Sequence, residues 1–206
     1  MQTNTVPAKS RPVSIRKLTV AAVLSAIAFV LMLLNFPIPA LIPSFVKMDL
    51  SDLPPLLGAF ALGPGWGVVI ELTKGLLDLI IGGTTTGGVG ELCNFLLGAV
   101  FVFTAGFVYQ RKKTRGMALL GALLGALAMA LLGVPINYWV TYPTYALFMP
   151  MEAIVDAYKA LLPAADSLLK CLLIFNLPFT FVKGMLDVLL CWLIYKPLSP
   201  VLHGRR

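Results

Sequence analysis

Charged residues are scarce in this sequence: only 12% of its 206 residues are Asp, Glu, Lys or Arg, against about 25% in soluble domains. Hydrophobic residues make up 59%. This balance excludes an ordinary soluble globular domain and predicts an integral membrane protein. The length is sufficient for about six membrane spans with short connections, and it leaves no room for a separate soluble catalytic domain.

The residue types that usually carry catalysis or bind metals are also scarce. The single histidine is His203, and the three cysteines form no C-x-x-C pair. Neither H-E-x-x-H nor G-x-S-x-G occurs. We therefore expect no catalytic residue, no metal site and no cofactor. The net charge of +7 does not predict nucleic-acid binding, because the basic residues form short clusters between apolar runs, where membrane orientation explains them.

Apolar runs predict six helices, at residues 18–35, 53–62, 66–82, 91–109, 116–139 and 168–196. The predicted fold is an all-α, six-helix transmembrane bundle that forms one membrane domain over 18–197, between an N-terminal segment (1–17) and a tail (198–206). The second helix is too short to cross a core of about 30 Å, so we expect a re-entrant external loop after the first helix. Residues 140–167, with an amphipathic piece at 151–161, are predicted to form a surface cap.

Lys and Arg are distributed unevenly between the two sets of connections. The N-terminal segment, the 111–115 loop and the tail hold 11 of them, whereas the opposite connections hold only Lys47, Lys159 and Lys170. The positive-inside rule then predicts that both termini are cytoplasmic.

Polar residues interrupt the apolar run of the last predicted helix. At 100° per residue, its four polar side chains fall within about 60° of one face: Asn176, Thr180, Lys183 and Asp187. A Lys or Asp at the bilayer centre costs about 2.5–3.5 kcal/mol, so this stripe is expected to line an interior site. The alternative is a structural ion pair between Lys183 and Asp187, with Asn176 and Thr180 joining helices.

Two further patterns have structural interpretations. One face of the third predicted helix carries Glu71, Lys74 and Asp78. These residues are interpreted as a trio whose charges neutralise one another, and the alternative is the centre of a small intramembrane enzyme. The fifth predicted helix carries a ridge of alanines that we expect to serve internal packing, at positions 118, 122, 126 and 130.

The predicted orientation gathers the 36–52 loop, Asn94, Asn137 and the start of the last helix on the external side. Asn side chains offer donors and an acceptor that match an imide-like C=O, N–H, C=O edge without burying a charge. A pocket of amides with aromatic and aliphatic walls suits a flat, largely apolar ligand. These features favour binding over catalysis.

Five motifs, in order along the chain, resemble a known family: KMDLSDLP, VGELCNFLLG, PINYW, PFTFVKG and YKPLSP. Over residues 18–203 the sequence is similar to the riboflavin-specific substrate-binding (S) component of energy-coupling factor (ECF) vitamin transporters. The resemblance implies a multi-pass protein of a bacterial cell membrane that captures riboflavin outside the cell. It also implies a transmembrane coupling protein and two ATPases as partners, so that the S component itself hydrolyses nothing. An S component for another vitamin or for FMN is the alternative.

The stripe, the orientation and the resemblance together predict a riboflavin site formed by Val46, Lys47, Met48, Asp49, Leu50, Glu91, Asn94, Asn137, Tyr138, Asn176, Thr180 and Lys183. The family often has Asn where this chain has Thr180, and Asn176, one turn earlier, is expected to compensate. The resemblance further implies that Ala22 and Ala26 form a small-residue face that packs on the coupling protein.

Overall fold

The computed structural model describes residues 14–84 and 87–203, with side chains as far as Ile194. Residues 1–13 of the predicted N-terminal segment, residues 204–206, and the side chains of the predicted tail lie outside this description. Lys9, Arg11, Lys196, Arg205 and Arg206, which contribute to the predicted orientation, are therefore not described.

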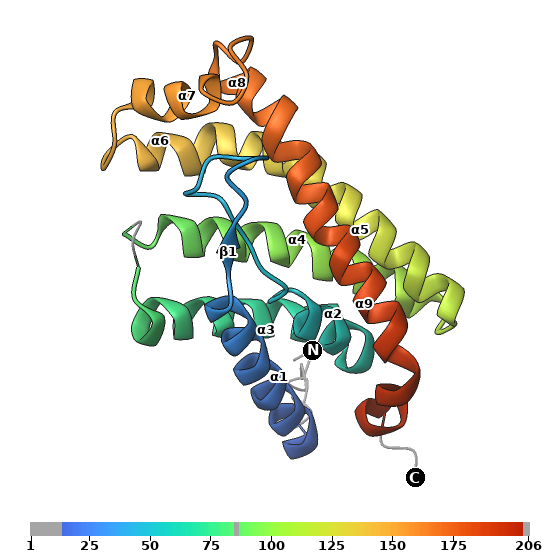
Figure 1. Ribbon diagram of the computed structural model, residues 1–206. Helices are drawn as coiled ribbons and strands as arrows, with labels where there is room; N and C mark the ends of the chain where they lie inside the picture. The colour runs from blue at the N-terminus through green and yellow to red at the C-terminus, as the bar shows by residue number, and fades with distance from the viewer. Residues whose placement is uncertain (1–13, 85–86, 204–206) are drawn as a thin grey trace, which may run out of the picture.

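Helices account for nearly all of the regular structure (Figure 1). They are α1 (Ile15–Leu33), α2 (Leu53–Leu62), α3 (Pro64–Leu77), α4 (Val89–Arg111), α5 (Arg115–Ile136), α6 (Tyr142–Tyr145), α7 (Met151–Lys159), α8 (Leu168–Cys171) and α9 (Leu177–His203). In the part of the chain that the structure describes, three π-helical turns extend or join them: η1 (Asp78–Gly82), η2 (Asn137–Thr141) and η3 (Leu172–Asn176). All six predicted helices are present, and the all-α fold is confirmed.

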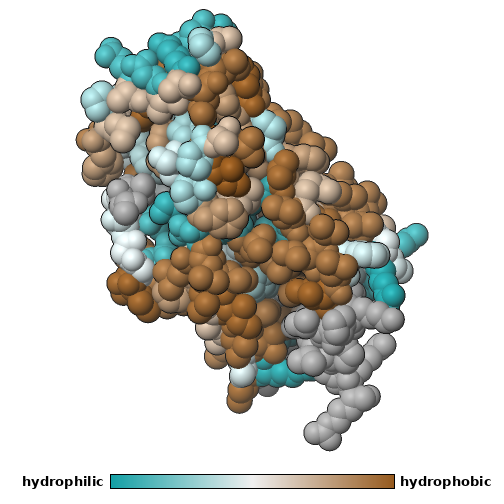
Figure 2. Space-filling model, viewed as in Figure 1, coloured by the Kyte–Doolittle hydropathy of each residue, from teal (hydrophilic) through white to brown (hydrophobic). Residues whose placement is uncertain are grey.

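Among the described residues, four helical segments are long and apolar enough to cross a membrane: Ile15–Leu33, Val89–Arg111, Arg115–Tyr145 and Leu168–Ile194. The third of these continues from α5 through η2 and α6, beyond the predicted end at 139. Apolar side chains cover most of the visible face, and hydrophilic ones gather at the end formed by α7 and α8 (Figure 2). The chain is thus a multi-pass membrane protein.

The short helix α2 occupies the centre of the bundle, where every residue from 53 to 60 is buried. Its bounds match the prediction, because prolines fit the first turn of a helix and Gly63, with a φ of 116°, ends it. The tight turn at Gly63 brings α3 back against α2. Gly67 of α3 packs on Ala59 of α2, where a Cβ on the glycine would lie 2.7 Å from the alanine Cβ.

The connection between α1 and α2 turns back into the molecule. Its strands β1 (Phe36–Pro37) and β2 (Lys47–Met48) pair antiparallel, and the chain then enters the bundle. Asp49, Ser51 and Asp52 are 5%, 0% and 1% exposed. The predicted re-entrant loop is therefore present, and it delivers two carboxylates to the interior.

Helix α5 packs closely against α4 on one side and α9 on the other. A Cβ on Gly121 or Gly125 would lie 2.6 Å from a backbone carbonyl oxygen of α4, and a Cβ on Gly184 of α9 would lie 2.9 Å from Ala126 Cβ. All four ridge alanines at 118, 122, 126 and 130 are buried, which confirms the prediction that they serve internal packing.

Candidate ligand-binding site

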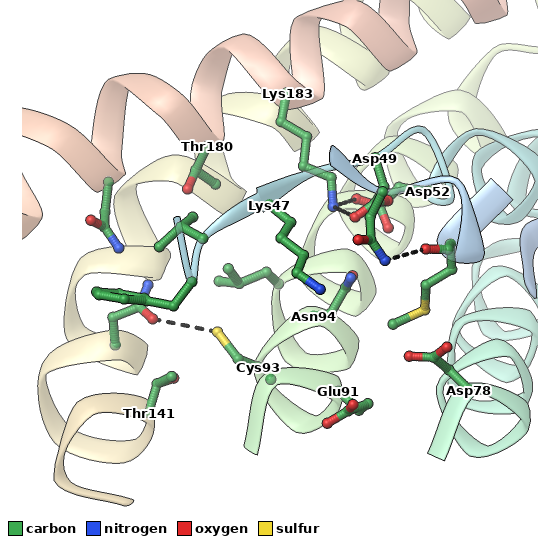
Figure 3. Close-up of a pocket in the computed structure, with 18 of the residues that line it drawn as sticks. Lys47, Asp49, Asp52, Asp78, Glu91, Cys93, Asn94, Thr141, Thr180 and Lys183 are labelled. Atoms are coloured by element: carbon green, nitrogen blue, oxygen red, sulfur yellow. Dashed lines mark hydrogen bonds and ion pairs between the residues drawn. The ribbon is translucent and has the colours of Figure 1, made fainter. Parts of the chain in front are cut away.

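A cavity of about 400 Å³ lies between the α1–α2 connection, α4, the η2–α6 segment and the η3–α9 segment. Its size is within the range of about 300–1,000 Å³ found for ligand pockets. Nine residues predicted from the sequence line it: Val46, Lys47, Asp49, Glu91, Asn94, Asn137, Asn176, Thr180 and Lys183. Lys47, Asn94, Thr180 and Lys183 converge on the same space in Figure 3.

The other three predicted residues do not line this cavity. Met48 and Leu50 alternate with Lys47 and Asp49 along an extended segment, in which successive side chains point to opposite sides. Tyr138, in the π-helical turn after α5, is 39% exposed and lies edge-on to Trp139. Whether a predicted residue lines the cavity thus depends on the direction in which its backbone segment points the side chain.

Lys183 connects the cavity to a buried network of charges (Figure 3). Its Nζ lies 3.2 Å from Asp49 Oδ2 and 3.1 Å from Asp52 Oδ2. Asp52 also forms an ion pair with Lys74 of α3. Ser51 fixes the turn between the two acids, because its N–H and hydroxyl donate to Asp49 Oδ1 at 2.9 Å and 2.6 Å.

The alternative interpretation of the stripe on the last helix, an ion pair between Lys183 and Asp187, is wrong. Lys183 pairs with Asp49 and Asp52 rather than with Asp187, whose two carboxylate oxygens are buried and accept no hydrogen bond from the described residues. Lys183 therefore binds two acids of the re-entrant loop, and it does not bind Asp187, which lies one turn away on the same helix.

The trio of Glu71, Lys74 and Asp78 is also divided, because α3 carries the first two and η1 begins with the third. Lys74 lies 2.7 Å from Glu71, but its other partner is Asp52 and not Asp78, which lines the cavity. Glu71 and Lys74 are both 0% exposed, so a substrate has no access to them. The three residues therefore do not form one accessible site, as an enzyme centre built on them would require.

Asn94 has hydrogen-bonding capacity that the protein does not use. No donor among the described residues reaches Asn94 Oδ1, although the atom is buried. The side chain projects from α4 into the cavity (Figure 3). A buried polar atom without a partner is costly, so this amide oxygen is suited to accept a hydrogen bond from a ligand. Asn137, in contrast, donates to Gly133 O at 2.8 Å and accepts from Cys93 Sγ at 3.4 Å.

Asn176 belongs to a closed ring of hydrogen bonds with two tyrosines. Its Nδ2 donates to the Tyr142 hydroxyl at 3.0 Å, and the Tyr158 hydroxyl donates to its Oδ1 at 2.6 Å. The two hydroxyl oxygens are 2.5 Å apart. Because the Tyr158 proton is directed at Asn176, the Tyr142 hydroxyl donates to Tyr158, and every member donates once and accepts once. Burial raises the pKa of Tyr158, which keeps its hydroxyl protonated as a donor.

Comparison with known proteins identifies the family. The family model for the substrate-specific component of ECF transporters matches residues 16–195. The chain belongs to this family. Its members are substrate-binding components of transporters, not enzymes.

Relatives of known name agree with this assignment. The chain is 35% identical to the riboflavin transporter FmnP of Bacillus subtilis (strain 168), over 93% of this chain and 96% of that protein. It is 31% identical to the riboflavin transporter RibU of Staphylococcus aureus (strain TCH60), over 89% and 90%. A solved structure, described as the S component of a bacterial ECF transporter, superimposes with a TM-score of 0.71 at 31% identity and covers 93% of this chain and 98% of that one.

Several residues that line the cavity of this S component were missed by sequence reasoning. They include Phe45, Asp52, Asp78, Cys93, Thr141, Tyr142 and Phe179. Asp52 carried a signal, because it stands in the same charged KMDLSDLP segment as Asp49. Tyr142 carried no such signal, because residues 140–167 were interpreted as a surface cap. In the structure, the helix that begins with α5 continues through η2 and α6 and carries Thr141 and Tyr142 into the site.

Proposed function

We propose that this S component binds riboflavin in the 400 Å³ cavity and presents it to an ECF transport complex. Asn94 carries the proposal, because its side chain lines the cavity and its buried amide oxygen lacks a donor among the described residues. The names of the two relatives support the same ligand. An isoalloxazine ring offers an imide N–H to such an acceptor and a flat apolar surface to Phe45 and Phe179.

The network around Lys183 would hold the site in a ligand-ready form. Riboflavin has about 27 heavy atoms, which at ~0.3 kcal/mol per atom gives roughly −8 kcal/mol, close to a micromolar dissociation constant. Tighter binding requires that little order is lost on association. Lys183 ties the re-entrant loop to α9 before any ligand enters, and so reduces that cost.

A fluorescence titration tests this proposal. The full chain, purified in mild detergent, is expected to quench riboflavin fluorescence saturably with one site and a sub-micromolar midpoint. Competition with FMN and with unrelated vitamins identifies the ligand. The absence of quenching, or displacement of riboflavin by another vitamin at lower concentration, would overturn the assignment.

The partners and orientation follow from the same proposal. Ala22 and Ala26 are exposed on α1, as is required of a small-residue face that packs on a transmembrane coupling protein. Two ATPases would supply the energy for transport. Both termini would be cytoplasmic in a bacterial membrane, with residues 18–197 forming one membrane domain. The cavity would then open to the outside, where the vitamin is captured.

A further inference from the structure

A second hollow lies at a different part of the bundle, between α2, α5 and α9. This groove has a volume of about 290 Å³ and shares no lining residue with the candidate ligand-binding site. Helices α5 and α9 run side by side along it (Figure 1). It begins at Arg115, the first residue of α5, and continues past Ala118 and Ala122.

Small side chains in the floor account for the hollow. Ala118 and Ala122 of α5 lie opposite Val188 and Cys191 of α9, and all four are buried. The rim is apolar and open, because Leu119 and Trp192 are 39% and 61% exposed. No amide or carboxylate side chain is among the described lining residues, so the groove does not suit a polar vitamin.

Positive charge is concentrated at the end of the groove where α5 begins. Arg115 lines it, and Lys112 and Lys113 lie immediately before α5, all three exposed. None of these three cations forms an ion pair with a carboxylate of the described residues. The sequence contains no Asp or Glu from residue 92 to residue 151, so no acid close to them in the sequence neutralises the three cations.

We propose that this groove binds one anionic phospholipid, with an acyl chain between α5 and α9 and the phosphate beside Arg115. An apolar groove with cations at one end complements a molecule that is apolar along its length and anionic at its head. The surrounding surface supports a lipid, because both helices belong to segments that are apolar enough to span the membrane. A neutral lipid would leave the three cations without a partner.

Native mass spectrometry tests this proposal on the full-length protein, after delipidation in a neutral detergent. Titration with palmitoyl-oleoyl-phosphatidylglycerol is expected to give one tightly bound lipid and a higher melting temperature. The phosphatidylcholine of the same acyl chains is expected to bind at least tenfold more weakly. Equal affinity for both lipids, or equal stabilisation by inorganic phosphate alone, would overturn the proposal.

Variants locate the site. Arg115→Gln is expected to weaken phosphatidylglycerol binding about fivefold, as for the loss of one cation near an anionic lipid, and Arg115→Lys is expected to restore most of it. Leu119→Gln places an amide in the acyl-chain wall and should weaken binding of the lipid. Leu131→Gln, at another exposed leucine of α5 outside the groove, is the matched control. Lipid affinity that is the same in Arg115→Gln, Leu119→Gln and the control would place the lipid elsewhere and refute the site.

Discussion

Lys183 of α9 and Asp52, the residue before α2, form an ion pair of 3.1 Å in the interior of the helical bundle. The Lys183 side chain is 12% exposed and that of Asp52 is 1% exposed. Asp52 also holds Lys74 of α3, so a single carboxylate connects the cavity wall to the centre of the bundle. This bridge ties the re-entrant loop to two helices.

Replacement of Lys183 by Met should lower riboflavin affinity at least tenfold, a change of about 1.4 kcal/mol. The substitution removes the cation that pairs with Asp49 and one of the two cations that pair with Asp52, and so loosens the loop that lines the cavity. Loss of one partner of a buried ion pair lowers the free energy of unfolding by about 3–5 kcal/mol. The protein should still insert in the membrane. Fluorescence titration and thermal unfolding measure the two effects.

Lys159→Met is the control for this variant. Lys159 pairs with Asp156 on the surface, with both side chains well exposed, so its loss should change stability by no more than about 1 kcal/mol. Unchanged riboflavin affinity in Lys183→Met would show that the charged stripe has only a structural role.

Replacement of Asn94 by Leu should separate binding from stability. The unliganded protein already leaves Asn94 Oδ1 without a donor, so its melting temperature should stay the same or rise. Riboflavin affinity should fall by about 1–3 kcal/mol, because the acceptor for the ligand is lost. A parallel fall in both quantities would contradict the role assigned to this amide.

Replacement of Tyr158 by Phe should weaken riboflavin binding through Asn176. The substitution removes the donor to Asn176 Oδ1 and breaks the ring with Tyr142, at a cost of about 1–3 kcal/mol in stability. Tyr138→Phe, at an exposed tyrosine outside the cavity, should change neither property. Wild-type affinity in Tyr158→Phe would mean that Asn176 needs no positioning by α7.

Gly98→Ala should destabilise the fold by about 1–3 kcal/mol, because the added Cβ would lie 2.6 Å from Glu71 Oε2 and push that carboxylate away from Lys74. Gly116→Ala in α5 meets no atom within 4 Å and should leave stability unchanged or raise it by up to about 1 kcal/mol. Thermal unfolding in detergent compares the two. Equal stability in both variants would show that the Glu71 position is adaptable.

Ala22→Trp should leave riboflavin binding intact and block uptake in cells that contain the coupling protein and the ATPases. Ala22 lies on the exposed face of α1, away from the cavity, and the bulky ring would separate two closely packed helices. Leu132→Trp, at an exposed position of α5, is the control. Normal uptake by Ala22→Trp would place the interface on another face.

Local chemistry made the helices predictable, whereas the pairing of charges depended on long-range contacts. The bounds of α2 follow from the prolines at its start and Gly63 at its end, and both signals are in the sequence. The partner of Lys183 does not follow from its own helix, because 134 positions separate it from Asp49 and only the fold of the loop brings them together. Tyr142 was missed because the helix that begins with α5 continues past its predicted end, and Tyr158 because its partner Asn176 lies on another helical segment.

The most direct test of the central claim is the identity of any chromophore that co-purifies with the protein. We expect protein expressed in riboflavin-containing medium to be yellow and to release about one equivalent of riboflavin on denaturation, with much less retained by Asn94→Leu. A colourless protein that retains no flavin and does not quench added riboflavin would contradict the account.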